Sequence, residues 1–242
     1  MVVDFQHHYI PVELAKQRGL YSETGRTLLQ EGGLPATTMH QRLYDLDLQL
    51  VDMDQAGVDV SVLSCLLGWS APLAECRFIN DDLAAIQKKY PRHFVGLAQA
   101  PVLEGKPALA ELRRALSDLG LRGVTITSQV SGLSLDSPKL YDLYELVCEL
   151  DTPLFVHPAL VPTGYEHLND YDLPRVLGRE VDLTVATTRL IAALVQSSNK
   201  PSSAKKSSKD EPICGFFFVI APPPFSVSQP APYRVAESSG SF

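Results

Sequence analysis

The chain has 242 residues, of which 45% are hydrophobic, and its formal net charge is −7 at pH 7. This length allows a large buried core in one or two domains, and an acidic balance without a basic stripe argues against nucleic acid and membranes as partners. No leader, no long apolar run and no CxxC pair is visible, so we expect a cytoplasmic protein with reduced thiols at Cys65, Cys76, Cys148 and Cys214.

Apolar runs rich in β-branched residues alternate along the chain with segments of helical periodicity. The first predicted strand covers residues 2–10, and a glycine-bearing loop follows it. Leucines and a methionine at three- and four-residue steps then predict a helix over 41–57 that ends at Gly57. Further strands are expected at 58–66, 93–100, 123–127 and 152–158, and further helices at 70–90, 107–120, 137–150 and 180–195.

This alternation of strands and helices predicts right-handed βαβ units that build a parallel sheet. The near-continuous apolar strands, such as PLFV at 153–156, are typical of a sheet covered on both faces. Five units in a row favour a barrel or a doubly wound sheet. No GxGxxG or P-loop follows any strand, so a nucleotide-binding fold has no positive support.

The composition changes abruptly after Val195. Residues 196–212 are rich in Ser and Lys, and residues 221–242 are rich in Pro and Ser. Such stretches bury too little apolar surface to offset chain entropy, so we expect a body over 1–195 and a disordered tail over 196–242, sensitive to proteases at 196–212. The exception is ICGFFFVIA at 213–221, which could pair as one strand and close the sheet imperfectly.

Two adjacent histidines in the first predicted strand raise the question of a metal site. On a strand, Gln6 and His8 share one face, whereas His7 points to the other. A carboxamide is a poorer zinc ligand than an imidazole, so this pattern alone favours a structural role for His8. His157 ends the last predicted strand, where barrel active sites are built, and fits a ligand or a structural histidine equally. The other candidates are expected to be solvated: His40, His93, His167, Asp52 and Asp54.

Five stretches, in order along the chain, carry a family resemblance. They are VDFQHHYIP, LQLVDMDQAGVDVSVLS, NDDLAAIQKKYPRHFVGLAQAPV, LGLRGVTI and LDSPKLYDLYELVCELDTPLFVHPA. Together they resemble the amidohydrolase-related proteins of the amidohydrolase superfamily, a group that includes aminocarboxymuconate-semialdehyde and γ-resorcylate decarboxylases. The resemblance covers about residues 2–195.

The resemblance implies an α/β fold, a TIM-type (β/α)8 barrel with one divalent metal, zinc being expected first and manganese second. By position, its metal-binding H-x-H pair falls on Gln6 and His8 and its strand-5 ligand on His157, so glutamine replaces the first histidine. The family's catalytic histidine after strand 6 and metal-binding aspartate after strand 8 have no counterpart here. The catalytic residues are therefore unknown, and we expect a barrel truncated after about five βα units. Gln49 matches an arginine that binds substrate carboxylate, which makes it a candidate substrate contact.

The resemblance thus predicts a metal-dependent, non-oxidative decarboxylase whose partner is a small aromatic or unsaturated carboxylic acid. A metal-dependent hydrolase of a lactone or amide is one alternative, and a catalytically inactive, truncated family member is another. Two imidazoles and one carboxamide should bind a metal weakly. Many relatives self-associate, which leaves a homo-oligomer open.

Overall fold

A parallel sheet runs through the computed structural model, which describes residues 1–23, 25–31, 33–168, 177–198 and 218–219. β4 pairs with β1 and β5, and β9 pairs with β6, in each case parallel. A bridge between Ala98 and Val124 joins the two groups and gives the order β1-β4-β5-β6-β9. All five predicted strands are confirmed; they are β1 (Val3–His8), β4 (Val60–Ser64), β5 (Phe94–Gly96), β6 (Val124–Thr127) and β9 (Leu154–His157).

A short strand, β10 (Phe218–Val219), extends the sheet beyond β9. It pairs parallel with Leu154 and Phe155. The prediction that part of 213–221 pairs as a strand is therefore confirmed for these two residues. The rest of the predicted tail, including the protease-sensitive tract up to residue 212, lies outside the described residues except where the last helix continues to Ser198.

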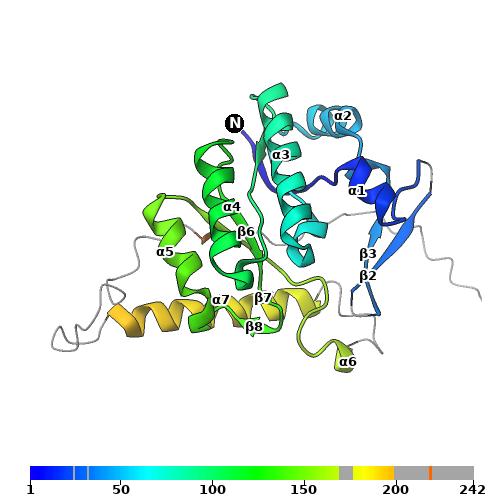
Figure 1. Ribbon diagram of the computed structural model, residues 1–242. Helices are drawn as coiled ribbons and strands as arrows, with labels where there is room; N and C mark the ends of the chain where they lie inside the picture. Colours follow the sequence, from blue (N-terminus) through cyan, green and yellow to red (C-terminus); the bar gives the residue numbers. More distant parts are fainter. Residues whose placement is uncertain (24, 32, 169–176, 199–217, 220–242) are drawn as a thin grey trace, which may run out of the picture.

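Helices follow the strands and cover one face of the sheet. Figure 1 shows α3, α4 and α5 side by side, with α7 running across their lower ends. Asp45 begins α2 as its cap, since its carboxylate accepts from the backbone N–H groups of Asp47 and Leu48. Gly57, with φ of 68°, ends the same helix in the left-handed region. Each predicted helix has its counterpart in α2 (Leu46–Ala56), α3 (Leu73–Lys89), α4 (Lys106–Ser117), α5 (Tyr141–Glu149) or α7 (Arg179–Ser198).

The expectation of a plain glycine-bearing loop after the first strand is wrong. This stretch forms helix α1 (Val12–Gln17) and an antiparallel hairpin of β2 (Thr27–Glu31) and β3 (Leu34–Met39). The hairpin turns at Gly33, whose φ is 81°. Two smaller elements were also not predicted, a hairpin of β7 (Gln129–Val130) and β8 (Leu133–Ser134) and helix α6 (Tyr165–Leu168).

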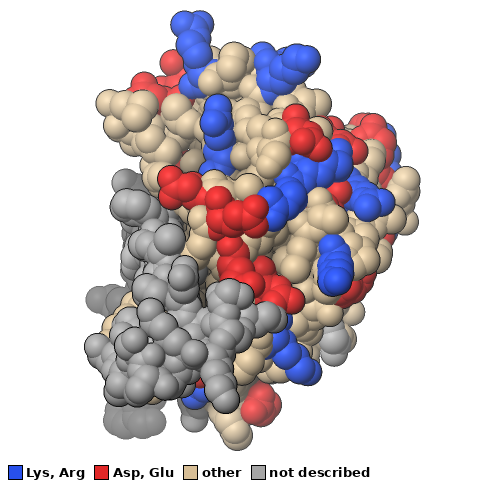
Figure 2. Space-filling model, turned by 60° about the vertical axis from the view of Figure 1, so that its left-hand side comes forward, with Lys and Arg blue, Asp and Glu red and all other residues tan. Residues whose placement is uncertain are grey.

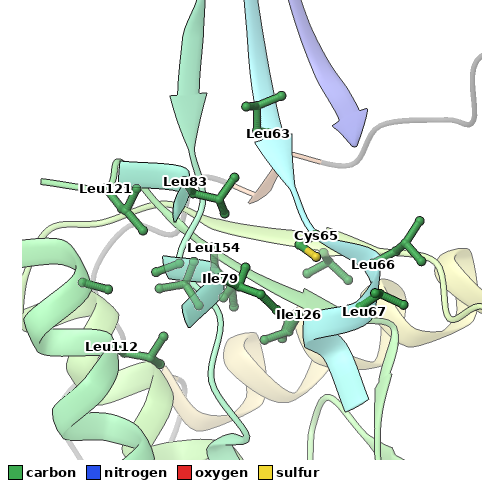
Figure 3. Close-up of a cluster of buried hydrophobic side chains, with 14 of the residues drawn as sticks. Leu63, Cys65, Leu66, Leu67, Ile79, Leu83, Leu112, Leu121, Ile126 and Leu154 are labelled. Atoms are coloured by element: carbon green, nitrogen blue, oxygen red, sulfur yellow. The ribbon is translucent and has the colours of Figure 1, made fainter. Parts of the chain in front are cut away.

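The main hydrophobic core lies between the sheet and the helices, on what we call the outer face of the sheet. Alternate strand residues point into it, and Figure 3 shows leucines and isoleucines from strands and helices meeting there. The opposite, inner face carries a smaller cluster in which Val62, Leu97 and Phe155 are buried. Outer-face residues of the main core include Leu63, Ile126 and Leu154 from strands and Ile79, Leu83 and Leu112 from helices.

The molecular surface mixes charges of both signs. On the face shown in Figure 2, lysine and arginine side chains lie among aspartates and glutamates and do not gather in one basic patch. No helix of the described residues is long and apolar enough to cross a membrane.

Candidate functional site

The inner face becomes polar where the strands end. His8 is the last residue of β1 and His157 the last of β9, so the parallel arrangement brings both to the C-terminal edge of the sheet. Their ring centroids are 5.0 Å apart. Gln6 joins them, with its Nε2 atom 3.4 Å from Nε2 of His157. The predicted convergence of Gln6, His8 and His157 is therefore confirmed.

His7 does not take part in this cluster. Its Nδ1 atom lies 3.1 Å from Oδ2 of Asp4, whose other oxygen accepts from the backbone N–H of Gln6 at 2.9 Å. This hydrogen bond with His7 outweighs burial and lowers the pKa of Asp4. β1 carries a bulge between Asp4 and His7, and Gln6 lies within it. Gln6 and His8 nevertheless share the inner face, as the sequence predicted, because both contact His157.

Burial keeps both imidazoles of the cluster neutral near pH 7. It lowers the pKa of His8 to about 4, with a further electrostatic contribution from the neighbouring His7. Burial likewise holds the pKa of His157 well below its usual range, and the neighbouring His8 adds to this effect. His157 is only 5% exposed. A neutral imidazole keeps one unprotonated nitrogen, which can accept a hydrogen bond or bind a metal.

The hydrogen bonds of the rings indicate which nitrogen that is. Nδ1 of His157 lies 2.7 Å from the carbonyl oxygen of Pro158, which can only accept, so Nδ1 carries the proton and Nε2 faces Gln6 as an acceptor. Nδ1 of His8 lies 3.0 Å from Oγ of Ser64, the last residue of β4. Such contacts at Nδ1 are the usual way in which a protein orients a metal-binding histidine.

Of the three candidate ligand positions, Gln6, His8 and His157, the two that carry an imidazole fit a divalent metal. His8 and His157 offer neutral imidazole nitrogens, and a rotated carboxamide would offer the oxygen of Gln6, a weaker ligand. Within the described ranges, no group of three His, Cys, Asp or Glu side chains could hold a metal ion. The donor set therefore suits a weakly held metal.

Buried hydrogen bonds fix the backbone on which His157 is carried. The N–H of Ser128, just after β6, donates to the carbonyl oxygen of His157 at 2.7 Å. The hydroxyl of Ser128 donates to Asp182 of α7 and accepts from the N–H of Ala159. Asp182 also accepts from the N–H of Thr163 at 3.1 Å. Helix α7 is thereby fastened to the end of β9, and the imidazole is held in place.

Sequence reasoning missed two further residues at this centre. The ring of Trp69 lies against His157, with centroids 4.3 Å apart, and meets His8 edge-on at 5.9 Å. Arg179 of α7 donates hydrogen bonds to the carbonyl oxygens of Ala36 in β3 and Leu160 after β9. Its positive charge lowers the pKa of both imidazoles, although less than burial does. The only available signal was that Trp69 is the single tryptophan of the chain.

Gln49 lies next to the site but faces the main chain. It is 2% exposed, and its Nε2 atom donates to the carbonyl oxygens of His8 and Arg42 at 3.0 and 2.6 Å. Its contact with a substrate stays a prediction.

The candidates expected to be solvated lie away from the imidazole pair: His93 is exposed, His167 pairs with Glu166, and Asp52 pairs with Arg42. Burial lowers the pKa of His40, which is only partly exposed.

Comparisons with known proteins agree with this architecture. The family model described as "Amidohydrolase" matches residues 3–200. The 2-amino-3-carboxymuconate-6-semialdehyde decarboxylase of Dictyostelium discoideum is 30% identical over 155 residues, which are 61% of this chain and 43% of that protein. The chain thus spans about half the length of such relatives.

Two solved structures have a similar fold. The 2,6-dihydroxybenzoate decarboxylase from Rhizobium matches 81% of this chain and 62% of its own, with a TM-score of 0.61 and 24% identity. The 5-carboxyvanillate decarboxylase of Novosphingobium aromaticivorans, crystallised with manganese and 4-hydroxy-3-methoxy-5-nitrobenzoic acid, matches 79% and 60%, with a TM-score of 0.62 and 21% identity. The parallel sheet, the helices on its outer face and a family match over most of the sequence lead to one conclusion: the chain belongs to the amidohydrolase family.

Proposed function

We propose that the polar centre on the inner face is part of a decarboxylase site, at which an aromatic or unsaturated carboxylic acid loses CO2 without oxidation. The observation that carries this proposal is the convergence of Gln6, His8 and His157 at the C-terminal edge of the parallel strands. In barrels of this kind, that edge is where active sites are built. Most of the curated relatives that match the chain are decarboxylases, and one is a hydratase, which favours loss of CO2 as the reaction.

His8 and His157 hold the divalent metal in this proposal, and Gln6 is a weak third ligand. Zinc is the first expectation because imidazole suits it well, and manganese is the second because the similar 5-carboxyvanillate decarboxylase contains it. When bound, the metal would supply a Lewis acid that polarises an oxygen of the acid.

The chain's own residues prepare the centre for an anion. Both imidazoles are neutral, so neither repels a metal, and Arg179 contributes a positive charge that acts on both of them. Asp4, a carboxylate on the same strand as His7 and His8, is tied to His7 and to the main chain. An acid with a flat ring suits this centre, because Trp69 and the imidazoles present aromatic surfaces.

A CO2-release assay tests the reaction. The purified chain is incubated with zinc or manganese and with 2,6-dihydroxybenzoate or 5-carboxyvanillate, and the headspace and the aromatic product are measured. Release of CO2 that His157→Ala abolishes and His93→Ala does not would establish decarboxylation at this centre. Hydrolysis of a lactone or amide without CO2 would contradict it.

We expect the chain as printed to give no measurable turnover, although the same sample should bind the acid. Only two of the expected imidazole and carboxylate ligands converge among the described residues, and the catalytic histidine and metal-binding aspartate that the family resemblance implies have no counterpart in the sequence. Losing ligands directly bound to a metal should cost more than the roughly 10- to 100-fold known for changes around them. Binding of the acid, measured by calorimetry, is therefore the primary readout of the proposed site, and turnover is the secondary one.

A further inference from the structure

The strongest unexplained feature near the imidazole pair is the indole of Trp69. This residue lies in a short 3-10 helix, Leu66–Ser70, directly after β4. Its ring is tilted by 32° against that of His157 and stands at 84° to that of His8. The indole therefore forms one side of the same polar centre, contributed by a different strand-helix unit from either histidine.

The indole nitrogen of Trp69 is buried and has no hydrogen-bond partner among the residues that the structure describes. A buried tryptophan N–H usually finds an acceptor, and one that does not requires an explanation. The neighbouring rings do not supply one, because Nδ1 of His157 is directed at Pro158, and its Nε2 atom faces Gln6. Within the described part of the chain, the indole of Trp69 thus packs against both imidazoles while its N–H donor has no acceptor.

The chemistry of the missing acceptor follows from the groups around it. An indole N–H can only donate, so the ligand atom must be an acceptor such as a carboxylate or phenolate oxygen. The charge of Arg179 acts on both imidazoles, and its guanidinium is held between β3 and the segment after β9. The charge of Arg179 and an unmatched donor both favour an oxyanion.

We propose that Trp69 is a substrate-binding residue, whose indole N–H donates a hydrogen bond to an oxygen of an aromatic carboxylate bound beside His8 and His157. This inference rests on the proposed function and adds to it the residue that recognises the acid. A tryptophan that only packed against the imidazoles would be replaceable by another flat ring. A tryptophan that binds the acid through its N–H would not be.

The matched variant is Trp69→Phe, which keeps an aromatic ring and removes the donor. Binding of 2,6-dihydroxybenzoate to the full chain is measured by calorimetry, with resorcinol, the same ring without its carboxylate, as the control ligand. We expect the variant to bind the acid roughly tenfold more weakly, as for a lost hydrogen bond to a charged group, and resorcinol equally. Equal binding of the acid by both proteins would overturn the inference while leaving the proposed function in place.

A second measurement on the unaltered chain does not depend on the variant folding. Trp69 is the only tryptophan, so a 15N spectrum contains a single indole N–H resonance. Saturation with 2,6-dihydroxybenzoate should move this resonance downfield, and resorcinol should not. A resonance that stays in place while calorimetry reports binding would refute the hydrogen bond. Absence of any binding of the acid would overturn both this inference and the proposed function.

Discussion

On β9, Leu154 and Val156 pack against the helices, whereas Phe155 and His157 lie on the other side of the same strand. β4 repeats the pattern, with Leu63 in the main core and Val62 and Ser64 on the inner face. The outer face is mostly apolar, with the buried Ser61 of β4 as an exception, and it holds helices. The inner face begins apolar and ends in imidazole, hydroxyl and indole groups. The outer face therefore holds residues whose burial stabilises the fold. The end of the inner face holds polar residues whose burial costs free energy.

The largest expected effect comes from a cavity in the outer core. Leu83 is fully buried between α3 and the sheet, so Leu83→Ala should lower the free energy of unfolding by about 2–5 kcal/mol. Urea denaturation measures the change. Phe78, on the same helix but 42% exposed, provides the control, and Phe78→Ala should change stability by less than about 0.5 kcal/mol. Equal effects at the two positions would mean that the helix does not pack as described.

A pH titration of stability examines the inner face. An unfolded histidine has a pKa of about 6.5, whereas that of His8 is lowered to about 4 by burial. Between these values the unfolded chain binds more protons, so stability rises with pH. The contribution is fully present above about pH 6.5 and is lost as the pH falls to about 4, by at most roughly 3 kcal/mol for His8.

The measurement is urea unfolding of the metal-free chain, with a chelator present, across that pH window. His8→Gln should flatten the profile. His93→Gln removes an exposed histidine and should leave the profile as it is. A profile that His8→Gln does not alter would show that the imidazole is not held neutral by burial.

The third prediction concerns the carboxamide at the ligand position. Gln6→His places a third imidazole beside His157, so zinc or manganese should bind at least roughly tenfold more tightly. The adjacent His7→Gln removes an imidazole that faces Asp4 instead, and it should leave metal affinity unchanged. Calorimetric titration of both variants gives the answer. Tighter binding need not bring turnover, because no proton donor is added.

The smallest effect is expected on the outer surface of the helices. Arg113 of α4 and Glu149 of α5 form a bidentate ion pair at 2.9 and 2.6 Å, but both side chains are about half exposed. Such pairs contribute about 0.2–1 kcal/mol and are weakened by salt. A double-mutant cycle of Arg113→Ala and Glu149→Ala measures the coupling free energy between the two side chains, by urea unfolding without added salt and again in 1 M NaCl. A coupling that exceeded the effect of Leu83→Ala would reverse the order of contributions argued above.

The sequence predicted the five strands and their helices because each element carries its own local signal. Apolar runs define the strands, and residues such as Asp45 and Gly57 define where α2 begins and ends. The hairpin over 27–39 was missed although two glycines separate its strands, because its side chains alternate weakly between buried and exposed. A hairpin that packs beside the sheet depends on tertiary contacts more than on its own pattern.

The site was predictable only where it lies on strands. Alternation placed Gln6 and His8 together, and the two side chains share a face in the structure although Gln6 lies within the bulge of β1, as their contacts with His157 indicate. Trp69 and Arg179 carry no such signal. Trp69 lies in a connection and Arg179 begins a helix. The ring of Trp69 contacts the imidazoles, and the charge of Arg179 acts on them, only through the folded arrangement of distant segments.

The contact between Gln6 and His157 joins residues 151 positions apart, and Arg179 reaches Ala36 across 143. Closing such long stretches of chain costs entropy before any contact returns stabilisation. During synthesis, β1 leaves the ribosome long before β9 and α7 have been made. The outer core can grow one unit at a time, because neighbouring units contact each other. The imidazole pair exists only once the first and last units have met. A ligand of this centre therefore binds chains that have finished folding, and it would stabilise them against unfolding by mass action.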